Sequence, residues 1–212
     1  MALSKIRSES VDLADDFAFT GTVTGAGSNS GYRFISKTDF TTTGAVYDFT
    51  NIFDANYKHY RMIWDIVGTD NTADVSHSWM MIKASDGSID TTGDIDYQAH
   101  GRDTDGSGRS VSNNNEDHFN FLYNTAEVNT HAFYEMSMFN PFVAEQTVCS
   151  GLVAYMVNAN TDSTTSNYSF HRSNTTSYSG LRLIGVDTNN SKTPDTSVTL
   201  TGTLILYGIA ES

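Results

Sequence analysis

The stretch Val198-Thr-Leu-Thr-Gly-Thr-Leu-Ile-Leu-Tyr-Gly-Ile209 carries the clearest structural pattern in this chain of 212 residues. Val198, Leu200, Leu204 and Leu206 fall on one side of an extended backbone, and threonines fall on the other side. This alternation is typical of a strand with one face in a hydrophobic core. It predicts that the chain ends in a half-buried β-strand.

Three earlier stretches show related patterns. Tyr134, Met136 and Met138 alternate with more polar residues, and the following Asn140-Pro141 predicts the end of that strand because proline lacks a backbone donor. Tyr60–Val67 and Val148–Val157 are apolar on both faces. Such strands are either covered on each side or in contact with another subunit.

The remaining apolar runs are separated by clusters of Gly, Asn, Asp and Ser, which are typical turn residues. The whole set amounts to roughly eight to ten strands, the number that a two-sheet jelly roll needs. The sequence therefore predicts an all-β chain that folds as a jelly-roll-like antiparallel β-sandwich. The further strand candidates are Ser76–Ile82, Ile95–His100, His118–Tyr123, Tyr168–Arg172 and Leu181–Ile184.

Two segments do not follow the strand pattern. Asp103–Asn115 is almost entirely polar or glycine, which predicts a long solvent-exposed loop. Apolar residues at helical spacing in Phe49–Tyr60 predict one short turn or helix.

The charge balance limits the possible partners. Twelve Lys and Arg residues against 25 Asp and Glu residues give a net charge of −13 at pH 7. Nucleic acid and anionic membranes would be repelled, so we expect neither as a partner. The single Cys149 lies in an apolar run, which predicts a buried, inert thiol. We also expect no membrane insertion and no cleaved leader, because no apolar run has the required length and position.

Residues 1–31 differ from the rest of the chain, because they end in a run of Gly, Ser and Asn that cannot hold a packed core. We expect an N-terminal arm or tether over 1–31, which docks to another protein, and a β-domain over 32–212. The apolar residues expected to dock the arm are Leu3, Ile6, Val11, Leu13, Phe17 and Phe19.

One segment resembles a calcium-binding loop. Asp103, Asp105 and Ser107 place oxygen atoms at alternate positions, and glycine follows at the sixth. The twelfth position is Asn114, where such a loop needs a bidentate glutamate. We therefore expect no cofactor or metal here, and calcium at Asp103 and Asp105 is only the alternative to a solvated turn.

No arrangement of residues predicts catalysis, and we expect no enzyme. The sequence contains no G-x-S-x-G motif, no phosphate-binding loop and no closely spaced pair of zinc ligands. Trp64 and Trp79 could stack on sugars, but their strand positions favour the core. Acidic pairs such as Glu116-Asp117 and Asp94-x-Asp96 could imitate the carboxylates of a glycosidase. In so acidic a chain we interpret them as solubilising loop charges.

Several stretches resemble virion structural proteins of tailed bacteriophages, marine ones in particular. Val46–Ile63 is similar to their aromatic F-x-x-x-Y-x-x-Y-R/K-I entry into a first long strand, and the matching residues are Phe53, Tyr57, Tyr60 and Arg61. Met138–Phe142, with Pro141 closing a strand, looks like the same family. So does the last strand, in which Tyr207-Gly208 stands in a G-x-I-x-L-Y-G-I ending. Ala2–Ile6 is similar to the start of phage tail-fibre proteins.

The resemblance covers about residues 45–210 and implies a jelly roll displayed on the phage particle, oligomeric and without a cofactor. We therefore expect a viral structural protein of the virion, assembled in the host cytoplasm, with tail-fibre or tail-tip host recognition as its first assignment. A capsid decoration (cement) or head-fibre protein is the alternative, and a carbohydrate-binding module or glycosidase is a further one. The expected partners are other virion proteins, copies of this chain in a homotrimer, and a host-surface glycan or receptor.

Overall fold

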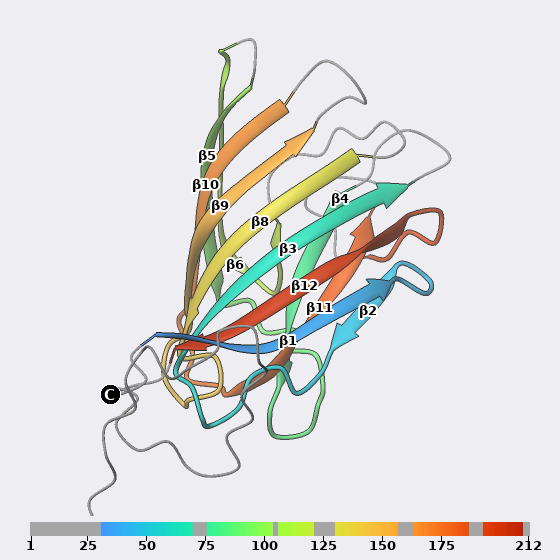
Figure 1. The fold of residues 1–212 in the computed structure, drawn as a ribbon. Coiled ribbons are helices and arrows are strands. Elements are labelled where there is room, and N and C mark those ends of the chain that lie inside the picture. The colour runs from blue at the N-terminus through green and yellow to red at the C-terminus, as the bar shows by residue number, and fades with distance from the viewer. Residues whose placement is uncertain are drawn as a thin grey trace, which may run out of the picture. The chain divides into compact units, whose positions relative to one another are not determined.

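The computed structural model describes residues 31–69, 76–103, 106–120, 130–156, 163–186 and 193–209, which form strands joined by turns (Figure 1). These residues contain no helix, so none of them belongs to a helix that could span a membrane. The prediction of an all-β chain is confirmed. The strands are β1 (Tyr32–Thr41), β2 (Val46–Phe49), β3 (His59–Thr69), β4 (Ser76–Lys83), β5 (Ile95–Asp103), β6 (Gly108–Glu116), β7 (Phe119–Asn120), β8 (Thr130–Phe139), β9 (Val148–Met156), β10 (Ser163–Arg172), β11 (Tyr178–Val186) and β12 (Thr199–Ile209).

The strands form two antiparallel sheets. The large sheet has eight strands in the order β1-β12-β3-β8-β9-β10-β5-β6, and the small sheet has four in the order β2-β11-β4-β7. The last strand of the chain therefore lies between β1 and β3, with Tyr32 opposite Ile209 on one side and His59 opposite Ile209 on the other. Neighbouring strands of a sheet are in many cases far apart in the sequence.

The alternation of side chains sets which face of the large sheet is buried. On β3, Tyr60, Met62, Trp64 and Ile66 are buried, whereas the residues between them are half-buried or exposed. The same rule holds on β12, where Val198 precedes the strand and the even-numbered leucines are buried. The core therefore lies between the large sheet and the small one.

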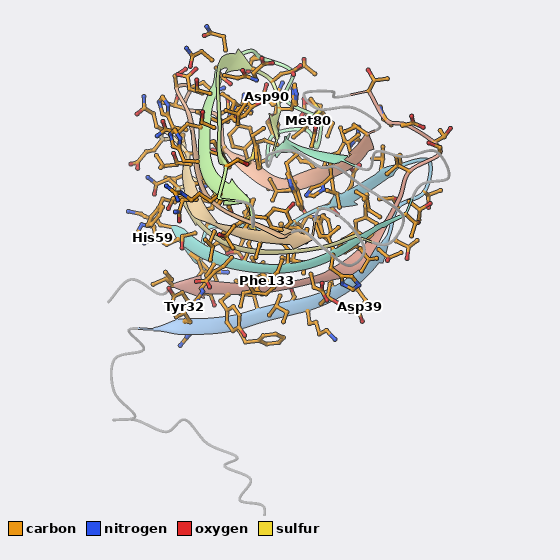
Figure 2. The ribbon with its side chains drawn as sticks, turned by 90° about the horizontal axis from the view of Figure 1, so that it is seen from above. Tyr32, Asp39, His59, Met80, Asp90 and Phe133 are labelled. Atoms are coloured by element: carbon orange, nitrogen blue, oxygen red, sulfur yellow. The ribbon has the colours of Figure 1, made fainter. Side chains whose placement is uncertain are left out.

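Aromatic rings join the two sheets across this core. Trp64 of β3 contacts Trp79 of β4 with ring centroids 4.3 Å apart, and Phe49 of β2 contacts Trp64 at 4.9 Å. Farther along the large sheet, Phe170 of β10 stacks on Phe119 of β7 at 4.1 Å. Each pair adds about 0.5 to 1.5 kcal/mol beyond the burial of its area. Figure 2 shows the large sheet curving around the small one.

One local prediction is wrong, and another is confirmed in one of its two forms. The segment predicted as a long loop, Asp103–Asn115, contains the edge strand β6, which pairs with β5. Its serines and asparagines have low strand propensity, but the backbone ladder to β5 supplies the order, and a polar edge discourages pairing with other chains. For Phe49–Tyr60 the prediction is one short turn or helix; the segment contains turns and no helix, so the turn is confirmed. Its backbone is held instead by bonds from the Ile52 and Phe53 N–H groups to the Ser179 carbonyl, at 2.9 and 3.1 Å.

The sequence predicts two apolar faces for β3 and β9, but neither of these strands is buried on both faces. The strand that is buried on both faces is β11. β11 has eight of its nine residues buried, because Leu181 and Leu183 face the main core while Ile184 and Val186 join Met80 in a second cluster. On β9, Val148 and Leu152 remain 41% and 43% exposed. The first explanation, that β9 is buried within the domain on both faces, is therefore wrong. The second explanation, that its outer face contacts another subunit, stays a prediction.

Candidate binding surface

The outer face of the large sheet carries the exposed apolar side chains of the described residues. All six large hydrophobic side chains that are exposed there belong to β1, β8 and β9 and point away from the core. They are Tyr32 (53%), Phe34 (62%), Phe133 (45%), Phe139 (36%), Val148 (41%) and Leu152 (43%), and we call them the apolar patch. Figure 2 shows Tyr32 and Phe133 on this side of the sheet. Exposed apolar side chains gathered on one face are typical of a contact surface.

Two residues from the phage-like motifs lie beside this patch. Tyr207 is opposite Arg61 in the register of β12 and β3. The Tyr207 ring contacts those of Tyr32 and Phe34 at 6.3 and 6.0 Å, and the Arg61 guanidinium lies 5.0 Å from the Tyr32 ring centre. Arg61 also forms an ion pair with Glu135, at 2.5 Å. These two motif residues therefore lie on the outer surface of the large sheet.

The other motif residues pack the turn before β3. Phe53 is buried and contacts Tyr60 at 4.9 Å, and the Tyr60 hydroxyl donates to the Asp54 carbonyl at 3.0 Å. Burial raises the pKa of Tyr60 to about 12. The Tyr57 ring lies against Gly208, where a Cβ atom would come within 2.4 Å of it. Only glycine permits so close an approach.

Pro141 follows the end of β8, and its carbonyl accepts a hydrogen bond of 2.6 Å from the Tyr178 N–H. The preceding Asn140 has a φ of 56°, a conformation that asparagine tolerates better than most residues. This turn therefore links the end of a large-sheet strand to the start of β11.

A shallow groove crosses the strands next to the apolar patch. Its floor is a single register row of outward-facing residues from β8, β9, β10, β5 and β6, in which each residue is opposite the next: Ser137, Ser150, Ser169, Gln98 and Ser112. Two separate hollows, which have no lining residue in common, lie along this row. One measures about 460 Å³ and includes Ser137 and Ser150, and the other measures about 300 Å³ and includes Ser169 and Ser112. We call this row and its hollows the serine groove.

Longer side chains flank the row on both sides and form the two walls of the serine groove, and each wall lines one of the two hollows. On one side, Val148 is opposite His171, which is opposite Asp96. On the other side, Leu152 is opposite both Glu135 and Asn167. The groove therefore combines hydroxyl, amide and carboxylate groups with apolar surface. No sequence pattern points to it, because its residues are adjacent only through the strand register.

A buried ion-pair network holds the far end of β10. Arg172 is fully buried, and its guanidinium contacts Asp90, at 3.0 Å, and Asp94. Tyr178 donates to Asp90 at 2.7 Å. Burial alone would raise the pKa of Asp90, but hydrogen bonds from Thr92 and Tyr178 and the Arg172 charge hold it below its ordinary value. Asp94 is therefore a structural partner of arginine, and its interpretation as a solubilising charge is wrong.

A second group of polar residues lies at the start of β7. Glu116, Asp117 and His118 offer ligand atoms within 4.8 Å of one another, and Asp117 is only 6% exposed. The interpretation of Asp117 as a solubilising charge is therefore wrong. His118 Nδ1 and Asp117 are hydrogen-bonded at 3.0 Å, which accounts for their proximity without a metal ion.

The remaining residues considered in the sequence analysis are either buried or lie, with few exceptions, outside the described residues. Trp64 and Trp79 are fully buried, as predicted, and so is Cys149, whose thiol pKa is raised by burial. Asp105 lies outside the described residues, and Asp103 is the last residue of β5. The arm residues also lie outside the described residues: Leu3, Ile6, Val11, Leu13, Phe17 and Phe19.

Comparisons with known proteins identify no relative of this chain. No family model, no curated protein and no solved structure matches it.

Proposed function

We propose that this chain is a non-enzymatic structural protein of a tailed-bacteriophage virion. In this proposal a jelly-roll domain is displayed on the particle, the segment 1–31 docks into a neighbouring virion protein, and the domain takes part in host recognition at a tail fibre or tail tip. The resemblance of Val46–Ile63 and of the last strand to phage virion proteins supports the class of protein. The strand order and the apolar patch support the architecture and its assembly.

The strand order is the observation that carries the jelly-roll proposal. In a jelly roll of eight strands, one sheet contains the first, eighth, third and sixth strands, and the other contains the second, seventh, fourth and fifth. The orders β1-β12-β3-β8 and β2-β11-β4-β7 follow this rule when the hairpins β5-β6 and β9-β10 are set aside. In this proposal the two hairpins are insertions that extend the large sheet beyond β8.

The apolar patch supports assembly with further copies of the chain. Its side chains lie on strands whose inner faces already fill the core, so a partner is needed to remove their outer faces from water. A closed homotrimer is the assembly we propose, because repeated copies of one apolar surface are buried efficiently by closed symmetry.

The decisive experiment is to locate the chain in an intact particle. We expect mass spectrometry of purified phage to find it, and electron microscopy to place its density at a tail fibre or tail tip. Density on the capsid would favour a decoration or head-fibre protein instead. Absence from purified particles would overturn the proposal. A variant lacking residues 1–30 should fold but fail to enter particles.

A further inference from the structure

We propose that the serine groove is a binding site for an uncharged, linear oligosaccharide. This inference deepens the proposed function, because it names the ligand class and the surface through which a displayed domain would recognise a host. Three properties of the groove support it: its length, the chemistry of its floor and walls, and the charge of the surrounding molecule.

The length of the groove suits an extended chain molecule. The floor crosses five strands, from Ser137 on β8 to Ser112 on β6. Neighbouring strands lie about 4.8 Å apart, so four such spacings make the floor about 19 Å long. Several sugar units in a row would occupy it, whereas a monosaccharide would occupy only a part.

The floor offers groups that hydrogen-bond to sugar hydroxyls. Within the described residues, the hydroxyls of Ser137 and Ser150 form no hydrogen bond to other protein groups. A ligand could therefore bind these hydroxyls without breaking a hydrogen bond inside the protein. At the other end, Gln98 and Ser169 are joined by a long contact of 3.4 Å, and the two keep further capacity. A serine hydroxyl both donates and accepts, as a sugar hydroxyl does.

The walls supply the remaining part of a sugar site. Val148 and Leu152, both more than two-fifths exposed, stand on opposite walls and offer apolar surface to the C–H groups of a sugar ring. Asp96 and Asn167 add acceptors and donors along the same walls. A hollow that joins apolar surface to a few convergent polar groups is the usual composition of a ligand site.

The charge of the protein selects against acidic sugars. The net charge is −13, and Asp96 and Glu135 stand at the edge of the groove. Glu135 is paired with Arg61, so no arginine of that wall is left to bind a carboxylate or phosphate on a sugar. The ligand is therefore an uncharged oligosaccharide.

The test uses the full chain, a glycan array and two matched variants. Neutral linear glucans, galactans and mannans, each from disaccharide to hexasaccharide, are compared with polysialic acid. Ser150→Phe places a ring on the floor, and Thr165→Phe places the same ring at an exposed position of β10 outside the groove. Gln98→Ala is a milder change at the other end of the floor.

We expect wild-type protein to retain a neutral series, with retention that rises with length. Ser150→Phe should weaken this binding by about tenfold or more, Gln98→Ala should weaken it less, and Thr165→Phe should leave it unchanged. Unfolding curves establish that each variant is folded. If Ser150→Phe does not fold, the comparison of glycan binding by Gln98→Ala with that by Thr165→Phe tests the groove proposal.

Three outcomes would overturn the groove proposal: no neutral sugar retained by wild-type protein, preference for polysialic acid, or equal binding by all variants. The virion proposal is tested separately, because phage carrying Ser150→Phe should still contain the chain. Particles without the chain would contradict the virion proposal, whatever the array shows.

Discussion

At the scale of single residues, the buried charged side chains of the described structure have partners, although a few buried polar atoms, such as Ser166 Oγ and Trp64 Nε1, have none. Arg172 has an inward position on β10, and the two aspartates beside it compensate its charge. His77 is a milder case. Its Nε2 atom is hydrogen-bonded to the Tyr134 hydroxyl, and burial lowers the pKa of His77 to about 4. The folded protein therefore contains His77 in its neutral form at neutral pH.

The stability of the protein should depend on pH through His77. The ordinary pKa of histidine is 6.5 and the folded value is about 4, so between these values the unfolded chain binds the proton more strongly. The free energy of unfolding should therefore fall as the pH falls from 6.5 to 4, by roughly 1 to 3 kcal/mol from this residue. Urea unfolding at several pH values measures the loss.

His77→Gln provides the comparison, because glutamine keeps a hydrogen-bonding group and does not titrate. The variant should lose less stability than the wild type over the same pH range. Equal slopes in the two proteins would show that His77 is not responsible. The other histidines are present in both proteins and cancel in the difference.

At the scale of elements, one glycine allows a tyrosine to lie across a neighbouring strand. Tyr168 of β10 is opposite Gly151 of β9, and its hydroxyl donates to the Glu135 carbonyl at 3.3 Å. A Cβ atom at position 151 would come within 2.1 Å of that carbonyl oxygen and 2.4 Å of the hydroxyl. Three adjacent strands of the large sheet therefore depend on the absence of a side chain at this position.

Gly151→Ala should destabilise the protein by about 1 to 3 kcal/mol, because the added methyl group forces Tyr168 or the backbone to move. Gly108→Ala is the matched control, since no heavy atom lies within 4 Å of its Cβ position and its φ is not positive. The control should change stability by less than about 0.5 kcal/mol. Equal effects of the two substitutions in urea unfolding would contradict the packing explanation.

At the scale of the whole molecule, the two faces of the large sheet have different surroundings. The inner face fills the core, and the outer face presents the apolar patch next to the serine groove. In the proposed assembly, neighbouring copies would cover Tyr32, Phe34, Phe133 and Phe139, while the other two patch residues and the groove stay open. The patch and the groove share Val148 and Leu152, so copies would border the groove.

Replacing patch residues should therefore separate the copies without unfolding them. The double variant Phe34→Ser and Phe133→Ser removes two exposed apolar groups outside the groove. We expect this variant to be monomeric, whereas we expect the wild type to be a homotrimer. The free energy of unfolding of the variant should differ little from that of the wild type, because both side chains are exposed. The two proteins are compared in strong dilution, at equal monomer concentration. Sedimentation equilibrium measures the mass, and a wild type that is monomeric at high concentration would overturn the assembly proposal.

Sequence reasoning could predict elements better than sites. The alternation of Tyr134, Met136 and Met138 predicts a strand and its buried face correctly, because both depend on neighbours in the sequence. β6 was missed because its order comes from pairing with β5 and not from its own residues. Arg172 could have been found, since it shares a face with Tyr168 and Phe170 and an arginine at such a position needs buried partners.

The order of apolar and polar residues by itself determined that this chain is all-β, and which side of β8 and β12 is buried. Only the tertiary structure decided which strands are neighbours. It placed Ser112, Ser137, Ser150 and Ser169 in one row and Asp90 beside Arg172. The physical reason is that side-chain alternation is a local property of an extended backbone. Register, in contrast, is set by pairing between distant segments and by the fit of the two sheets around their shared core.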